Sequence, residues 1–181
     1  MKHSKIICAV LAITLTTPAL GDEYGVTNPE ELSMEGMMDR MRHGQAHPMD
    51  YAIGYGAAKA GRHEDAREIF QSAIEHTNSA QAMTWMSWLE DNGLGGMENP
   101  SAAAEWDRKA AELGSEVAAF NYGLDLMRGR GVPRDDIAGR KMIDRAAAMG
   151  DATARHLVEN DYDLDSVTPD ADEWKYELNL F

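Results

Sequence analysis

Residues 126–136, LMRGRGVPRDD, interrupt a stretch that is otherwise rich in helix-forming residues. Gly129 and Gly131 are separated by one residue and followed by Val132 and Pro133. This spacing fits a glycine-rich loop that holds a phosphate group, and it fits equally well a sharp turn between two helices. The choice decides whether the chain is interpreted as a nucleotide enzyme or as a helical scaffold.

The same pair of glycines recurs 36 residues earlier, as Gly93 and Gly95, in a register that needs no gap. Further columns of this repeat hold alanine or large apolar residues: Ala46, Ala82, Ala118 and Ala154; Ala66, Ala102 and Ala138; Met34, Phe70, Trp106 and Met142. A phosphate loop would need a preceding strand and a Gly-Lys-Ser/Thr ending, or a βαβ setting, and the sequence has neither. We therefore interpret the glycines as turn residues.

Each period of the repeat predicts two helices. The apolar spacing and the turn residues place helices at about 48–60, 64–77, 80–91, 100–114, 116–128, 136–149 and 152–160. Asn99 and Pro100 are typical of an N-cap and a first helical position, and Gly114 is typical of a helix end. Since one helical pair cannot bury both of its faces but stacked pairs can, the fold class is an all-α solenoid.

At this level of detail the chain resembles the Sel-one-like repeat, a relative of the tetratricopeptide repeat. Two successive periods carry the motif: Ala102, Trp106, Lys109, Ala110, Ala111 and Gly114, then Ala118, Gly123, Gly129, Gly131 and Val132. Residues 46–79 look more like a tetratricopeptide repeat. The resemblance implies a right-handed superhelix of antiparallel helix pairs that binds other proteins, often as an exported adaptor or regulator.

Composition narrows the function classes. The 181 residues carry a formal net charge of −14, which argues against nucleic acid and anionic lipid as partners because both need clustered Lys and Arg. Residues 1–21 are typical of a signal peptide, with Lys2 and Lys5 before a short apolar run and cleavage predicted after Gly21. We expect export to the periplasm and no stable membrane insertion afterwards, the alternative being a retained anchor.

The remaining chain divides into an N-terminal capping helix region at 22–45, repeats at 46–160, and an acidic linker with a C-terminal capping helix at 161–181. In the last segment Thr168 and Pro169 are typical of a helix start. Trp174, Leu178 and Phe181 would then form one apolar stripe. We predict that this helix folds back on the last repeat across a linker at 161–167, the alternative being a free docking peptide.

Two segments have the residue types of metal sites. Residues 34–49 combine Met34, Met37, Met38, Met41 and Met49 with His43 and His47, which suits soft copper(I), although methionines on one helical face also suit core packing. Residues 161–172 place Asp161, Asp163, Asp165 and Asp172 like calcium-loop ligands, but Ser166 replaces the glycine of that loop. Packing and an acidic linker are the favoured interpretations, so no metal residue or cofactor is predicted.

The sequence shows no catalytic constellation, because HExxH and Gly-x-Ser-x-Gly are absent and the only cysteine, Cys8, lies in the signal segment.

In a solenoid the first helices of successive pairs usually line the concave face. We predict partner-binding residues along these helices at Trp85, Leu89, Asn121, Asp125 and Arg128, with core packing as the alternative for each. The resulting hypothesis is a non-enzymatic periplasmic adaptor that binds an unidentified protein. The alternatives are copper handling through 34–49 and, least supported, a hydrolase.

Overall fold

The computed structural model describes residues 34–43, 45 and 50–167, and all regular structure in these ranges is helical. The elements in chain order are α1 (Met34–Arg42), α2 (Asp50–Lys59), α3 (His63–Thr77), α4 (Ala80–Asp91), α5 (Pro100–Glu112), α6 (Glu116–Arg128), α7 (Asp136–Met149), α8 (Ala152–Glu159) and the 3-10 helix η1 (Leu164–Val167). The predicted all-α class is confirmed, and the helix bounds agree with the prediction to within two residues.

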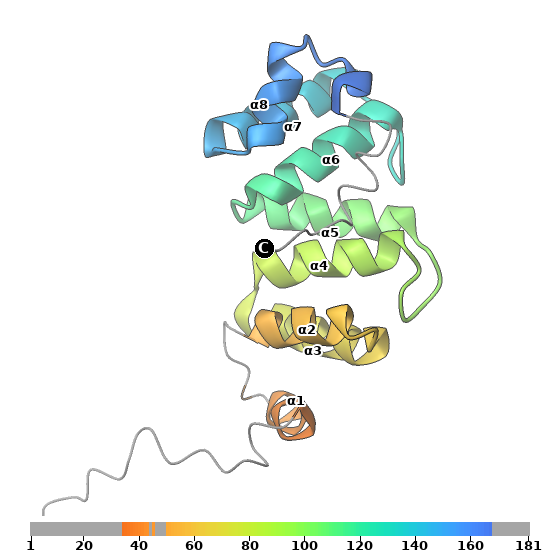
Figure 1. Cartoon of the computed structure of the whole chain (residues 1–181), viewed down its shortest axis with the longest axis vertical. Helices are drawn as coiled ribbons and strands as arrows, with labels where there is room; N and C mark the ends of the chain where they lie inside the picture. Colours follow the sequence, from red (N-terminus) through yellow and green to blue (C-terminus); the bar gives the residue numbers. More distant parts are fainter. Residues whose placement is uncertain (1–33, 44, 46–49, 168–181) are drawn as a thin grey trace, which may run out of the picture.

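The helices stack as consecutive pairs along the long axis of the molecule. α2 packs on α3, α4 on α5 and α6 on α7, while α8 packs on α7 as the first helix of a further pair. Figure 1 shows α2, α4, α6 and α8 on one side of the stack and α3, α5 and α7 behind them. Each pair touches the next one, as expected of an α-solenoid.

Side-chain caps fix the helix starts that the sequence predicted. Asn99 accepts a hydrogen bond from the backbone N–H of Ala102, and Pro100 occupies the first turn of α5. Other caps are made by Ser79, Ser115, Asp135 and Asp151. These side chains satisfy backbone donors that would otherwise have no partner at the beginning of each helix.

The Gly-x-Gly turns serve chain reversal and packing between successive pairs. Gly129 and Gly131 have φ of 71° and 67°, a conformation that disfavours residues with a Cβ. A Cβ on Gly131 would lie 2.1 Å from the carbonyl oxygen of Pro100, at the start of α5. The Ser101 hydroxyl also donates to the carbonyl of Gly131 at 2.9 Å. The second glycine is therefore pressed against the preceding pair, which supports the turn interpretation.

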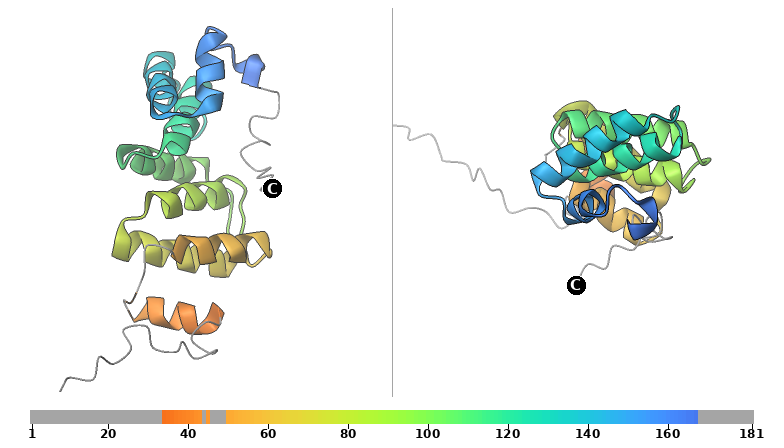
Figure 2. Two further views of the ribbon diagram at one scale, coloured as in Figure 1. Left: turned by 60° about the vertical axis from the view of Figure 1, so that its left-hand side comes forward. Right: turned by 90° about the horizontal axis from the view of Figure 1, so that it is seen from above.

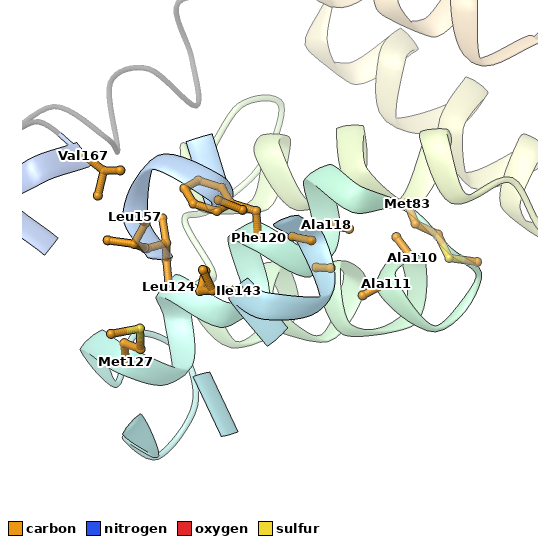
Figure 3. Packing of buried hydrophobic residues seen from close by; sticks show 13 residues of the cluster. Met83, Ala110, Ala111, Ala118, Phe120, Leu124, Met127, Ile143, Leu157 and Val167 are labelled. Atoms are coloured by element: carbon orange, nitrogen blue, oxygen red, sulfur yellow. The ribbon is translucent and has the colours of Figure 1, made fainter. Parts of the chain in front are cut away.

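Two buried clusters form the core. One joins α2, α3 and α4 around Ile69, Phe70 and Leu89, and the other joins α5 to α8 around Phe120, Ile143 and Leu157 (Figure 3). In the alanine column, Ala82, Ala118 and Ala154 are fully buried, while Ala46 lies outside the described residues. Small side chains at these points allow the helices to approach closely, as the repeat pattern predicted.

The C-terminal end of the stack differs from the predicted acidic linker. Residues 164–167 form η1, and Tyr162, Leu164 and Val167 pack onto the apolar cluster of α7 and α8. Asp163 accepts a hydrogen bond from the backbone N–H of Asp165, as in a turn. Within the described ranges, no group of three or more His, Cys, Asp or Glu side chains is placed to hold a metal ion. The predicted capping helix and Asp172 lie outside the described residues.

At the other end, α1 packs against α3. Met38 and Met41 are buried in the cluster of α2–α4, which favours core packing over copper binding for these two thioethers. Residues 44 and 46–49, including His47 and Met49, lie outside the described residues, as does the predicted signal peptide at 1–21. Of the helices that the structure describes, none has the length and apolar character needed to cross a bilayer.

Candidate functional site

Three partly exposed aromatic side chains gather on α2 and α4. The ring of Tyr55 lies 4.9 Å from that of Trp85, and Trp85 lies 5.7 Å from Trp88 in an edge-to-face arrangement. All three residues lie between fully buried and exposed. We call Tyr55, Trp85 and Trp88 the aromatic face; it lies on first helices of two successive pairs.

The buried ring of Phe70 packs against the Trp85 ring of the aromatic face. Phe70 of α3 is fully buried and stacks on Trp85, with ring centroids 6.3 Å apart and planes 10° from parallel. Phe70 reaches this position because α2 has a glycine there: a Cβ on Gly54 would lie 2.5 Å from the Phe70 ring. The Trp85 ring is thus held by packing on one side, which lowers the entropy lost when a ligand binds.

An arginine ties the two helical pairs together beside this face. The Arg67 guanidinium of α3 donates to the Glu90 carboxylate at 2.7 Å and to the carbonyl oxygens of Leu94 at 2.7 Å and Leu89 at 3.1 Å. These contacts satisfy the end of α4 and fix its position on α3. α2 packs on α3 as well, so α2 and α4 hold their aromatic side chains in a defined arrangement.

The predicted binding residues fall into two groups. Trp85 and Arg128 are partly exposed, whereas Leu89 is fully buried and Asn121 and Asp125 are only 7% and 5% exposed. The prediction of an open polar face at Asn121 and Asp125 is therefore wrong, because α6 lies between neighbouring helices and has most of its surface covered. The role of Trp85 and Arg128 in partner binding stays a prediction.

Asn121 belongs instead to a buried polar network between α4, α5 and α6. The fully buried Asp107 carboxylate accepts a hydrogen bond from the Ser87 hydroxyl at 2.6 Å and a longer one from the Asn121 amide at 3.4 Å. Two donors thus compensate part of the cost of burying this carboxylate. The network makes internal contacts and is not available to a partner.

The sequence interpretation missed two members of the aromatic face. Trp88 could have been found, because it follows Trp85 by three residues and so lies on the same side of α4. Tyr55 could not, because the partner of Trp85 on α2 depends on how the two pairs stack. Chemically, the face offers stacking and apolar contact to another molecule.

A family model for the Sel1 repeat matches residues 80–115 and 117–151. The chain contains two Sel1 repeats. The first supplies Trp85 and Trp88, and the second begins at the α6 helix; Tyr55 comes from the pair that precedes them. The resemblance noted from the sequence is confirmed for these residues. Sel1 repeats generally mediate protein–protein interaction and are generally non-catalytic.

Solved structures with Sel1-like repeats resemble this fold. A Sel1 repeat protein from Oxalobacter formigenes is 30% identical, with a TM-score of 0.54 over 58% of this chain and 41% of its own. A protective antigen with an SLR fold, present in uropathogenic Escherichia coli strains, is 22% identical, with a TM-score of 0.60 over 71% of this chain and 29% of its own.

Helicobacter pylori cysteine rich protein B is 16% identical, with a TM-score of 0.54 over 70% of this chain and 97% of its own. The last two likenesses concern the fold alone. This chain spans less than half the length of the first two proteins. No curated protein matches the sequence.

Proposed function

We propose that this protein is a non-enzymatic adaptor that binds a partner protein through the aromatic face of α2 and α4. The observation that carries the proposal is the set of three incompletely buried aromatic residues on two successive helical pairs, in which the ring of Trp85 lies against those of Tyr55 and Trp88. Aromatic side chains with one side packed and one side open are typical anchors of protein interfaces. The general role of Sel1 repeats in protein–protein interaction supports it.

The chemistry of the face indicates what it binds. Rings that meet at an angle leave apolar surface for an aliphatic or aromatic side chain, and stacked helices present it to a peptide or a helix. We expect a partner segment with large apolar side chains on one side.

A surface variant beside the face tests the proposal. Ala52 is exposed and lies three residues before Tyr55 on α2, so Ala52→Arg places a long charged side chain next to the rings without removing any of them. Ala148→Arg, at an exposed position of α7, is the matched control. Proximity cross-linking in the native cell, followed by affinity measurement with each captured protein, should identify a partner whose binding falls roughly tenfold in Ala52→Arg alone. Equal binding by both variants would refute this surface.

We also infer that the protein is exported. The basic start, short apolar run and small residues before Asp22 in the sequence support this inference. Expression of the full chain in a Gram-negative host, fractionation and N-terminal sequencing provide the test. The expected product lies in the periplasm and begins at Asp22; an uncleaved cytosolic chain would contradict export.

A further inference from the structure

At the C-terminal end of the stack, residues 162–167 pack onto α7 and α8. Val167 of η1 is 5% exposed and belongs to the same cluster as Leu157 of α8. Tyr162 hydrogen-bonds to Asp144 of α7, and the guanidinium of Arg140 lies 4.9 Å from the centre of its ring. Residues 162–167 thus cover part of the apolar surface of α7 and α8.

Residues 168–181, TPDADEWKYELNLF, carry apolar side chains that would gain free energy by packing against another apolar surface. Trp174, Leu178 and Phe181 have the spacing of one helical stripe, and acidic residues precede them. A segment of this kind is the apolar peptide that the aromatic face is suited to bind.

The described chain ends where this segment can reach the aromatic face. In Figure 2, left, η1 and α8 lie on the same side of the stack as α2, so the described chain ends on the side of the first helices. α4 is two first helices away from α8; first helices of successive pairs make little direct contact, so the distance is on the order of 20–30 Å. Trp174 follows Val167 by seven residues and Phe181 by fourteen, so an extended chain reaches about 23 Å at Trp174 and about 46 Å at Phe181.

We propose that residues 168–181 bind in cis to the aromatic face, with Trp174, Leu178 and Phe181 against Tyr55, Trp85 and Trp88. This proposal rests on the proposed function, since it names the segment that occupies the binding surface in the absence of a partner. A tethered segment has an effective concentration on the order of millimolar, so even a weak contact competes with a partner in solution. The C-terminal segment thereby sets a threshold for partner binding.

Disulfide trapping in the full chain tests the contact. In a Cys8→Ser background, Ala52→Cys on α2 is combined with Lys175→Cys, and Ala148→Cys on α7 with Lys175→Cys serves as the control pair. We expect the 52–175 disulfide to form within one chain and roughly tenfold faster than the 148–175 disulfide, because docking raises the local concentration of the two thiols.

The apolar stripe is then removed in the same background. Trp174→Ser, Leu178→Ser and Phe181→Ser together should lower the 52–175 rate to that of the control pair, while Asn179→Ser should leave it unchanged. An equal rate of 52–175 disulfide formation with and without the apolar stripe would overturn the proposal. A disulfide that forms between two chains, at a rate that depends on protein concentration, would overturn it as well.

Partner binding separates this inference from the proposed function. If both hold, the triple serine variant binds the partner more tightly than the natural chain, since its competitor is gone. Partner binding that is sensitive to Ala52→Arg, with 52–175 trapping that ignores the stripe, would overturn the inference alone. Stripe-dependent trapping, with no partner sensitive to Ala52→Arg, would overturn the proposed function alone.

Discussion

The two Sel1 repeats fill the same helix crossing with different side chains, polar in the first repeat and apolar in the second. In the first, Ser87 of α4 meets Asp107 of α5 through a hydrogen bond, and Asn121 of the next helix adds a second donor. Thirty-six residues later these three positions hold Gly123, Ile143 and Leu157, of which the last two are fully buried apolar residues.

This difference has a steric origin. A Cβ on Gly123 would lie 2.7 Å from the Ile143 side chain, so glycine is what allows the isoleucine to lie across α6 (Figure 3). In the first repeat the smaller Asp107 leaves room for a serine side chain, and the hydroxyl uses that room to donate to the carboxylate. Both repeats therefore fill the space at this helix crossing and keep the helices in contact, the first with a polar set of side chains and the second with an apolar set.

The largest effect is expected at the second glycine of the turns. Gly131→Ala combines a positive φ with a Cβ 2.1 Å from the Pro100 carbonyl oxygen, so we expect it to lower the free energy of unfolding by about 2–4 kcal/mol. At Gly95, the equivalent position in the first repeat, the Cβ would meet the His63 backbone at 2.8 Å, so Gly95→Ala should cost less. Urea unfolding followed by circular dichroism measures both.

Gly150→Ala is the control for this comparison, because φ there is 116° but the added Cβ would meet nothing within 4 Å. It should cost about 1 kcal/mol, from backbone strain alone. Equal losses in Gly131→Ala and Gly150→Ala would show that contact with the preceding pair contributes nothing.

Removing the buried carboxylate comes next in size. Asp107→Ala takes away the acceptor of Ser87 and Asn121 and should lower the free energy of unfolding by about 2–3 kcal/mol. The triple variant Ser87→Gly, Asp107→Ile, Asn121→Leu installs the apolar set of the second repeat and should recover stability to within about 1 kcal/mol of the natural chain. Thermal unfolding of the two variants decides the point: a triple variant as unstable as Asp107→Ala would show that the two solutions cannot be exchanged.

A smaller loss is expected at Arg130. This residue lies between the two glycines of the second turn, and its guanidinium lies 3.0 Å from the buried Asp91 carboxylate at the end of α4. Arg130→Leu should therefore cost about 1–2 kcal/mol, whereas Arg134→Leu, which loses only an exposed pair with Asp136, should cost less than about 0.5 kcal/mol. Chemical denaturation compares the two, and indistinguishable midpoints would argue against a contribution of the Arg130–Asp91 pair.

The smallest expected effect is on the stability of the protein at alkaline pH. Burial raises the pKa of the Tyr122 phenol, which occupies the column of Met86 in the first repeat. The folded chain therefore holds this proton more tightly than the unfolded chain, and the associated stability is present below about pH 10 and lost as the pH rises further. Tyr122→Phe should flatten the fall in melting temperature between about pH 9 and 11 relative to the natural chain. An identical slope in both proteins would contradict a burial effect at this phenol.

The sequence alone determined the repeat and the local structure of each helix. The 36-residue period, the cap at Asn99 and the glycines at 129 and 131 depend on interactions within a few residues, so they can be recognised without the fold. Trp85 could be selected as a candidate for the same reason: it lies on the first helix of a pair in a repeat whose geometry is regular.

Only the tertiary structure decided which faces stay open. α6 lies between neighbouring helices, so the polar side chains of Asn121 and Asp125 are covered although their spacing resembles that of an exposed stripe. Likewise the partner of Arg130 lies 39 residues away, and Tyr55 meets Trp85 only because two pairs stack. The apolar periodicity of a helix indicates one buried face. An inner helix of a solenoid is covered on several faces, and which further faces are covered depends on neighbouring helices that the local sequence does not specify.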